Sequence, residues 1–292
     1  MEKYGDFCGF TFNGVHSSEL NLIRVSDGSR YNDITGPTFQ DKTMTVPGVD
    51  ETYFFNTTYQ QKTFAIRIAF DSMSDLQYRR FRQVFNGKDI ASLIFDEAPY
   101  KSYTAKVQNP PQLQTICFNE DGARVYKGEG TINFVCYNPF ARSVNKWLSQ
   151  YNMDTSEWAN TSGLLETQGD YDGSGTSIKI YNPGDLPTDW IAFYQFGANN
   201  QCALSKITIN GTDMLNFNTF IKKGSDVYIG INSKTQLIEG YNANSKRTGT
   251  IYNEYITSGD FFKIGISDPD ETQYFYSTGA SCTKLEYHYI YY

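Results

Sequence analysis

The sequence contains two histidines, His16 and His288, the residues best suited to general acid–base chemistry near neutral pH. His16 follows the turn signal Asn13-Gly14, and His288 lies in a strand-like run near the C-terminus. A Ser–His–Asp triad needs a base beside an activated nucleophile, and no spacing in the sequence indicates such a pair. Gly173-Ser174-Gly175 lacks the strand-to-helix pattern of a nucleophile elbow. We therefore expect structural or surface roles for both histidines.

Two acidic segments have the residue types that bind a hard cation. Asp170-Tyr171-Asp172-Gly173 resembles part of a calcium loop, but it lacks the glutamate at the twelfth position and the flanking helices. Asp268-Pro269-Asp270-Glu271 is a similar cluster. We expect both to be solvated turns, and the sequence predicts no metal and no cofactor.

The five cysteines are widely spaced, odd in number and free of C-x-x-C pairs. A zinc site needs paired ligands at short spacing, and a disulfide framework usually needs an even count. We expect reduced, buried thiols. Among the aromatic residues, Trp158 and Trp190 are the candidates for stacking on sugar rings, although aromatic side chains more often lie in a core or an interface.

Composition excludes several classes of protein. The 292 residues include 25 Lys and Arg against 32 Asp and Glu, and 16% are aromatic. This aromatic content predicts a folded chain, and the acidic balance argues against specific nucleic-acid binding. We expect no membrane insertion, because no run of eighteen apolar residues occurs. The N-terminus also lacks the apolar run of a signal peptide.

Alternating apolar and polar residues predict that most of the chain forms antiparallel strands. Clear examples are Phe64 to Phe70 and Ile132 to Cys136. One segment predicts a helix: Ser74 is a capping residue, the helix covers residues 75–85, and Asn86-Gly87 predicts a left-handed stop. A second, shorter helix is expected around residues 144–150.

The domain boundary is expected just after Asn138-Pro139-Phe140, where the composition shifts toward Asn, Thr, Ser and Gly. We predict a β domain with one helix over residues 1–141. Residues 142–176 would form a linker and the entry to a second domain. Residues 177–292 would then form a β-sandwich.

Five segments in order over residues 7–141 resemble phage distal tail proteins, the tail-tip hub family of siphophages. They are residues 10–22 (FTFNGVHSSELNL), 46–50 (VPGVD), the helix at 75–86, 94–107 (IFDEAPYKSYTAKV) and 128–141 (GEGTINFVCYNPFA). The resemblance implies a mainly β fold. The N-terminal ring domain would be a β-sandwich or barrel-like, with one α-helix and an extended hairpin. The C-terminal domain would be a galectin-like or carbohydrate-module-like jelly roll.

The resemblance also implies a function without catalysis. Such a protein is a hub at the virion tail tip, made in the host bacterial cytoplasm, and six N-terminal domains form a ring that continues the tail tube. The implied partners are further copies of the chain, the tail tube protein, the tail-associated hub protein, and fibres or receptor-binding proteins.

Residues 30–60 are expected to supply the extended hairpin. Closed rings use two different surfaces of each subunit, and a hairpin that reaches a neighbour's sheet would add strands across that interface. The residues that we assign to this ring interface are Val46, Pro47, Gly48, Asp50, Tyr53 and Phe54. The alternative is an ordinary hairpin within one sheet.

Two other functions remain open. The first is a carbohydrate-binding adsorption protein, whose C-terminal sandwich would bind host glycans through an exposed aromatic platform that includes Trp158 or Trp190. The second is a tail-tip hydrolase with acidic residues in a cleft, which no spacing in the sequence favours.

Overall fold

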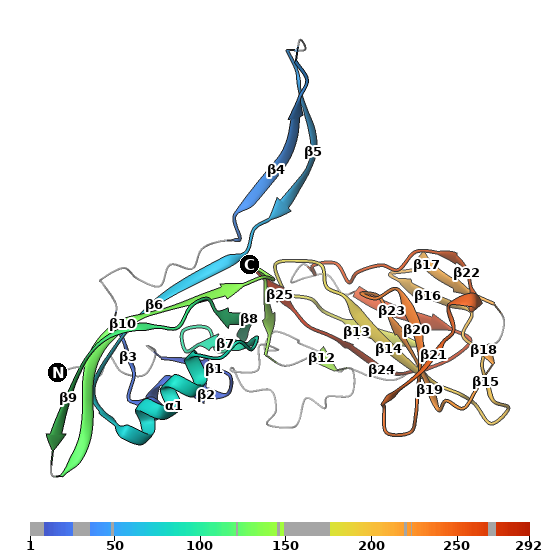
Figure 1. Cartoon of the computed structure of the whole chain (residues 1–292). Helices are drawn as coiled ribbons and strands as arrows, with labels where there is room; N and C mark the ends of the chain where they lie inside the picture. Colours follow the sequence, from blue (N-terminus) through green and yellow to red (C-terminus); the bar gives the residue numbers. More distant parts are fainter. Residues whose placement is uncertain are drawn as a thin grey trace. The chain divides into compact units, whose positions relative to one another are not determined.

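The structure is a computed structural model, and it describes most of the chain. The described residues are 9–25, 36–47, 50–120, 122–144, 147–148, 176–218, 221–222, 224–267 and 273–292. The chain divides into two compact units, Met1–Arg142 with Tyr292, and Ser143–Tyr291. Both are built from antiparallel strands, and the described residues contain one α-helix, in the first unit (Figure 1).

The first unit contains a sheet with the strand order β2-β1-β7-β8-β10-β6-β3, and β9 pairs with the first part of β10. Its strands are β1 (Phe10–Phe12), β2 (Val15–His16), β3 (Ile23–Arg24), β6 (Lys62–Ser74), β7 (Ala91–Phe95), β8 (Lys101–Val107), β9 (Gln112–Glu120) and β10 (Ala123–Cys136). β11 (Ala141–Ser143) follows at the boundary between the units. A short 3-10 helix, η1 (Ser17–Leu20), connects β2 to β3.

The predicted alternation in β6 and β10 is confirmed. Ile66 pairs with Ile132 and Phe64 with Phe134, and Ile66, Ile132 and Phe134 are buried on one face of the sheet. Because partners directly opposite each other share a face, the residues between them, such as Arg67 and Thr131, lie on the other face. The sheet therefore has one apolar face and one polar face.

Helix α1 (Asp75–Phe85) covers the apolar face. Ser74 Oγ accepts a hydrogen bond from Gln77 N at 3.3 Å, and Ser74 N donates to Gln77 Oε1 at 3.0 Å, which confirms Ser74 as the cap. The ring of Phe85 packs on those of Phe12 and Phe134, with centroids 5.9 and 6.4 Å away. The predicted left-handed stop is wrong, because Asn86 has φ −92° and its N–H donates to Arg82 O as in a continuing helix.

The second unit contains two larger sheets, β12-β24-β14-β19-β20-β21 and β13-β23-β16-β17-β22, and the two-stranded pair β15-β18. The strands are β12 (Trp147–Leu148), β13 (Ser177–Ile180), β14 (Trp190–Gln195), β16 (Lys206–Ile209), β17 (Thr212–Phe217), β19 (Tyr228–Asn232), β20 (Leu237–Tyr241), β21 (Arg247–Ile251), β22 (Ile256–Gly259), β23 (Gln273–Thr278) and β24 (Cys282–Tyr287). Shorter elements are β15 (Gln201–Cys202), β18 (Ile221–Lys222), β25 (Ile290–Tyr291) and the 3-10 helix η2 (Asn253–Tyr255).

Both sheets of the second unit contribute to one core. Ile178 and Phe275 come from one sheet, Ala192, Ile231 and Leu285 from the other, and all five are fully buried. The turn predicted at Asn210-Gly211 is confirmed, since both residues have positive φ and join β16 to β17. The helix expected around residues 144–150 is wrong at Trp147–Leu148, which pairs with β24 as β12.

Candidate interaction surfaces

A two-stranded hairpin extends from the body of the first unit (Figure 1). It consists of β4 (Phe39–Thr45) and β5 (Thr52–Tyr59), and it is called the arm below. Its Thr, Tyr and Phe residues have high strand propensity, and Lys42 and Thr43 flank a β-bulge. Among the described residues, the two strands of the arm pair only with each other.

The arm is fixed at its base. Gln60 N donates to Thr38 O at 2.7 Å, and Gln60 Nε2 donates to Gln40 Oε1 at 2.7 Å. The ring of Tyr59 meets that of Phe140 edge to face, with centroids 5.0 Å apart. These contacts hold the two strands together where they leave the body.

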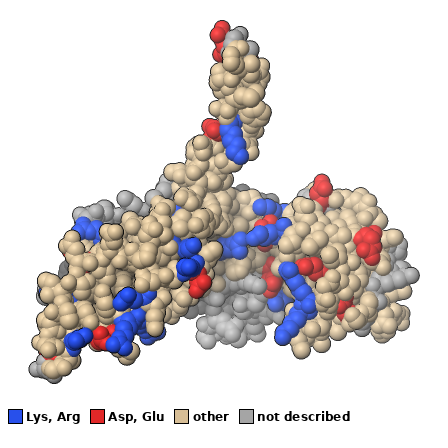
Figure 2. Space-filling view, in the orientation of Figure 1, with Lys and Arg blue, Asp and Glu red and all other residues tan. Residues whose placement is uncertain are grey.

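Large apolar side chains on the arm are exposed on both of its faces. Phe39 and Phe54 are 67% and 62% exposed and lie on one face, opposite Tyr59 and Thr43 respectively. Met44 and Tyr53 pair on the other face, and each is about half exposed. Figure 2 shows that most of the visible surface of the arm carries no charged residue. A two-stranded hairpin in water is marginally stable by itself, so this exposed apolar surface indicates a partner.

Five of the six predicted interface residues are described, at the tip and on the second strand of the arm. Pro47, Asp50, Tyr53 and Phe54 are exposed and Val46 is partly exposed, whereas Gly48 lies outside the described residues. Four further exposed apolar residues of the arm were not predicted from the sequence, although they lie among the Thr, Tyr and Phe residues of the predicted hairpin. They are Phe39, Met44, Phe55 and Tyr59.

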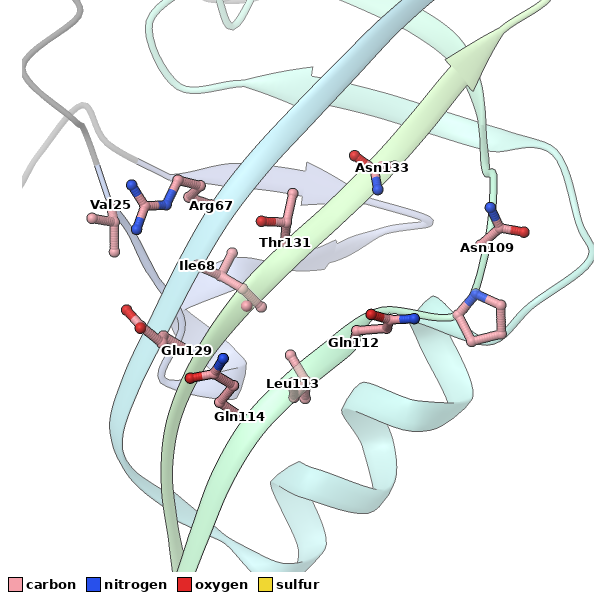
Figure 3. A pocket seen from close by; sticks show the side chains of 12 residues that line it. Val25, Arg67, Ile68, Asn109, Gln112, Leu113, Gln114, Glu129, Thr131 and Asn133 are labelled. Carbon is pink, nitrogen blue, oxygen red and sulfur yellow. The ribbon is translucent and has the colours of Figure 1, made fainter.

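A second surface lies on the polar face of the sheet in the first unit. A hollow of about 650 Å³ is lined by side chains from β6, β10 and β9, among them Arg67, Glu129, Gln112 and Thr131 (Figure 3). A neighbouring hollow of about 700 Å³ also includes Gln114 and Glu129 and extends to Ile23, Ile116 and the ion pair of Asp71 with Lys127.

The pairing register of β6, β10 and β9 brings the side chains of this face together. Glu129 pairs with Ala69 on one side and with Gln114 on the other, and Thr131 pairs with Arg67 and Gln112. The described side chains that line the two hollows include charges of both signs and amides, and none of them is a histidine or a cysteine. Such a surface can dock a polar partner.

One group of residues resembles a hydrolytic triad. His16 Nδ1 lies 2.6 Å from Ser18 Oγ, and His16 Nε2 lies 3.2 Å from Asp96 Oδ2. The same His16 Nδ1 accepts the backbone N–H of Ser18 at 3.3 Å, and Asp96 Oδ2 accepts the N–H of Gly9 at 2.9 Å. These bonds cap η1 and tie β1 to the end of β7, which confirms a structural role for His16.

Gly9 permits this close packing, since a Cβ there would lie 2.3 Å from Asp96 Oδ2 and 2.8 Å from His16 Nε2. His288 is also structural: its Nδ1 lies 3.0 Å from Ser143 O, within the second unit.

The remaining predicted candidates do not form a site in the described structure. Trp190 is 1% exposed and its Nε1 donates to Phe262 O, so its ring offers no face to a sugar and that expectation is corrected. Trp158, Asp170–Gly173 and Asp268–Glu271 lie outside the described residues. Cys136, Cys202 and Cys282 are free and buried as expected, but Cys117 on the edge strand β9 is exposed, which corrects the expectation for that thiol.

Among the described residues, no group of three or more His, Cys, Asp or Glu side chains could hold a metal ion. No helix in the described part of the chain is long and apolar enough to cross a membrane.

Comparison with protein families identifies the first unit. Residues 15–136 match the family described as "Phage tail protein RIFT-related domain", and this range covers the strands from β2 to β10, η1, the arm and α1. These residues therefore match a domain of phage tail proteins, a family of structural components and not of enzymes. A search of curated protein sequences found no match to the chain.

Solved structures extend the likeness to both units. The crystal structure of the Dit (gp 19.1) protein of phage SPP1, described as a paradigm of the hub adsorption apparatus, matches with a TM-score of 0.61 at 10% identity. The match covers 97% of this chain and 99% of the SPP1 protein, so the fold is shared over the full length. A chain of the phage P2 baseplate in its activated conformation with calcium matches at 7% identity over 92% of this chain and 90% of that one. Its TM-score of 0.44 is too low to support an argument. The resemblance to siphophage distal tail proteins is thus confirmed.

Proposed function

We propose that this protein is the distal tail hub of a siphophage, and that its N-terminal domains form a closed, hexameric ring at the tail tip. The observation that carries the proposal is the arm, a hairpin with large apolar side chains exposed on both faces. The domain match over residues 15–136 and the fold shared with SPP1 Dit support the assignment to a tail hub.

A second copy of the chain is the partner that explains the arm best. Arms that reach the next subunit around a ring would each be covered once, because every subunit offers one arm and receives another. The exposed edge strand β9, which pairs only with β10 among the described residues, is a suitable acceptor for an added strand. The interface would use Val46, Pro47, Gly48, Asp50, Tyr53 and Phe54, together with Phe39 and Phe55.

The ring would act as a connector between other tail proteins and not as a catalyst. One of its faces would meet the tail tube protein and the other the tail-associated hub protein. The C-terminal unit, over about residues 177–292, would be a galectin-like or carbohydrate-module-like sandwich that carries fibres or receptor-binding proteins. The protein would be made in the cytoplasm of the bacterial host and would function in the virion.

Light scattering of the purified protein at several concentrations tests the ring. We expect a mass near six times 33.2 kDa, or that of two such rings stacked. The double variant Phe39→Ser, Phe54→Ser should shift the mass toward a single chain, because the apolar contacts of the arm are lost. Tyr137→Ser is the matched control, since Tyr137 is an equally exposed aromatic residue outside the arm.

Two outcomes would contradict the proposal. A single-chain mass for the wild-type protein at every concentration would argue against a ring that forms by itself. An oligomer that keeps its mass in the arm variant would show that the arm does not hold the ring together.

A further inference from the structure

The outer face of the β13-β23-β16-β17-β22 sheet carries two exposed tyrosines. Residues on β23 alternate, so that Phe275 points into the core while Tyr274 and Tyr276 point outward, 38% and 37% exposed. Their ring centroids lie 5.8 Å apart, and the ring planes are within 30° of parallel. The two rings together form an aromatic pair on a sheet surface.

The backbone under this pair is held firmly. Tyr274 N donates to Asn210 Oδ1 at 2.8 Å, and Asn210 N donates to Tyr274 O at 3.0 Å. Asn210 has φ 50° and belongs to the Asn210-Gly211 turn, so this turn clamps β23 directly under the aromatic pair. A rigid aromatic surface loses little conformational entropy when it binds a ligand.

The surroundings of the pair are polar. On one neighbouring strand Lys179 pairs with Tyr274 and Ser177 with Tyr276, while on the other the buried Thr208 pairs with Tyr276. Register places further hydroxyl, amide and ammonium groups on the same face, namely Lys206, Asn216, Ser258 and Thr278. None of the side chains that the structure describes on this outer face of the five strands is aliphatic.

We propose that this face binds the pyranose rings of a polysaccharide. A sugar ring presents an apolar C–H face, which packs on aromatic rings, and a rim of hydroxyls, which exchange hydrogen bonds with hydroxyl, amide and ammonium groups. The outer face of β23 supplies both kinds of group side by side. The arm has a different composition, in which Met44 and several Phe residues provide the continuous apolar surface typical of protein contacts.

This sugar site uses other residues than those expected from the sequence. Trp158 and Trp190 were the expected stacking residues, and Trp190 is buried in the core. A polysaccharide site on β23 goes beyond the hub function and does not depend on the ring. If this face binds no polysaccharide, the oligomer mass expected for the ring is unchanged, so the two proposals can fail separately.

An array of immobilised neutral hexose and N-acetylhexosamine oligosaccharides tests this site with the full-length protein. We expect the wild-type protein to bind at least one pyranose oligosaccharide. Tyr274→Leu with Tyr276→Leu should weaken that binding by at least about tenfold, because leucine keeps apolar area but has no ring. Tyr274→Phe with Tyr276→Phe keeps both rings and should bind within about threefold of the wild type.

Ile251→Ser is the control, because Ile251 is exposed on β21 of the other sheet and should not affect sugar binding. Circular dichroism and thermal unfolding confirm that each variant is folded. Absence of any sugar binding by the wild-type protein would overturn the proposal, as would a leucine variant that binds as well as the wild type. Binding of another virion protein to the wild type that the leucine variant loses, without any sugar binding, would identify the face as a protein-docking surface instead.

Discussion

Individual residues of this chain owe their properties to neighbours that are distant in sequence. His16 contacts Asp96, eighty positions away, and the pair caps η1 and anchors Gly9. Local sequence around His16 shows only a turn, so the Ser18–His16–Asp96 group could not be predicted from spacing. Its function as a cap also shows that a triad-like chain of hydrogen bonds does not by itself indicate a hydrolase.

The described thiols differ in exposure, and this difference predicts their reactivity. Burial raises the pKa of Cys136 and of Cys282 to about 12, whereas Cys117 is exposed on β9. The thiolate is the reactive form, so at pH 8 almost none of the two buried thiols is reactive. We expect iodoacetamide to modify Cys117 at least about tenfold faster than Cys136 or Cys282, as measured by mass spectrometry of the peptides.

Denatured protein is the control for this experiment, since unfolding should make the cysteines react at similar rates. Raising the pH toward 12 should increase the reactivity of Cys136 and Cys282 as their thiolates form. Modification of Cys136 in the native protein as fast as Cys117 would contradict the described burial.

Among the elements, α1 was the easiest to predict because its signals are local. Ser74, the charged first turn and the spacing of Phe81 and Phe85 are all present within a dozen residues. The left-handed stop was wrong because Asn86-Gly87 only permits such a conformation and does not require it. The chain continues past Asn86 with ordinary negative φ values.

Removal of the helix cap tests the contribution of this local signal. Ser74→Ala should lower the free energy of unfolding by about 1 kcal/mol, because Gln77 N loses its acceptor at the start of α1. Urea denaturation of the full chain measures the change. Ser72→Ala, two residues earlier on the exposed end of β6, should have an effect within about 0.5 kcal/mol of zero. Equal effects of the two substitutions would show that the capping bond does not stabilise the helix.

Strand β10 shows how an element can depend on its neighbour. A Cβ on Gly128 would lie 2.3 Å from Gln114 O, and one on Gly130 would lie 2.6 Å from Gln112 O. The two glycines thus allow β9 to approach closely along the first part of β10. Glycine in a strand is consistent with such an approach, but the sequence alone does not say which backbone comes near.

For the molecule as a whole, the two units have separate hydrophobic cores. Phe10, Phe85 and Phe134 pack together in the first unit, and the core of the second unit consists of residues between Ile178 and Tyr289. Because each core consists of its own residues, we expect two unfolding transitions in calorimetry.

Phe134→Ala should lower the free energy of unfolding of the first unit by about 3–5 kcal/mol. Leu285→Ala should lower that of the second unit by about 2–5 kcal/mol. Each substitution removes a fully buried side chain from one core. The test is whether each variant shifts one transition and leaves the other in place. A single transition that both substitutions shift equally would show that the units unfold together.

Features that depend on local periodicity and on turn chemistry could be predicted from the sequence. They are the mainly β chain, α1 with its Ser74 cap, and the buried faces of β6 and β10. These features follow from side-chain alternation and backbone preference, which neighbouring residues encode. The hairpin in residues 30–60, with Tyr53 and Phe54 at an interface, was instead implied by the resemblance to distal tail proteins.

Which residues are exposed, and which meet across the sheets, became known from the folded structure. Trp190 in β14 and Tyr274 in β23 are both aromatic, yet one is buried in the core and the other faces outward. The exposure of Cys117, the contact of His16 with Asp96 and the polar hollow beside β9 likewise depend on strand order and register. Strand order depends on pairings between residues that are far apart in the sequence. These pairings depend on the free energy of the whole chain and cannot be predicted from a local pattern.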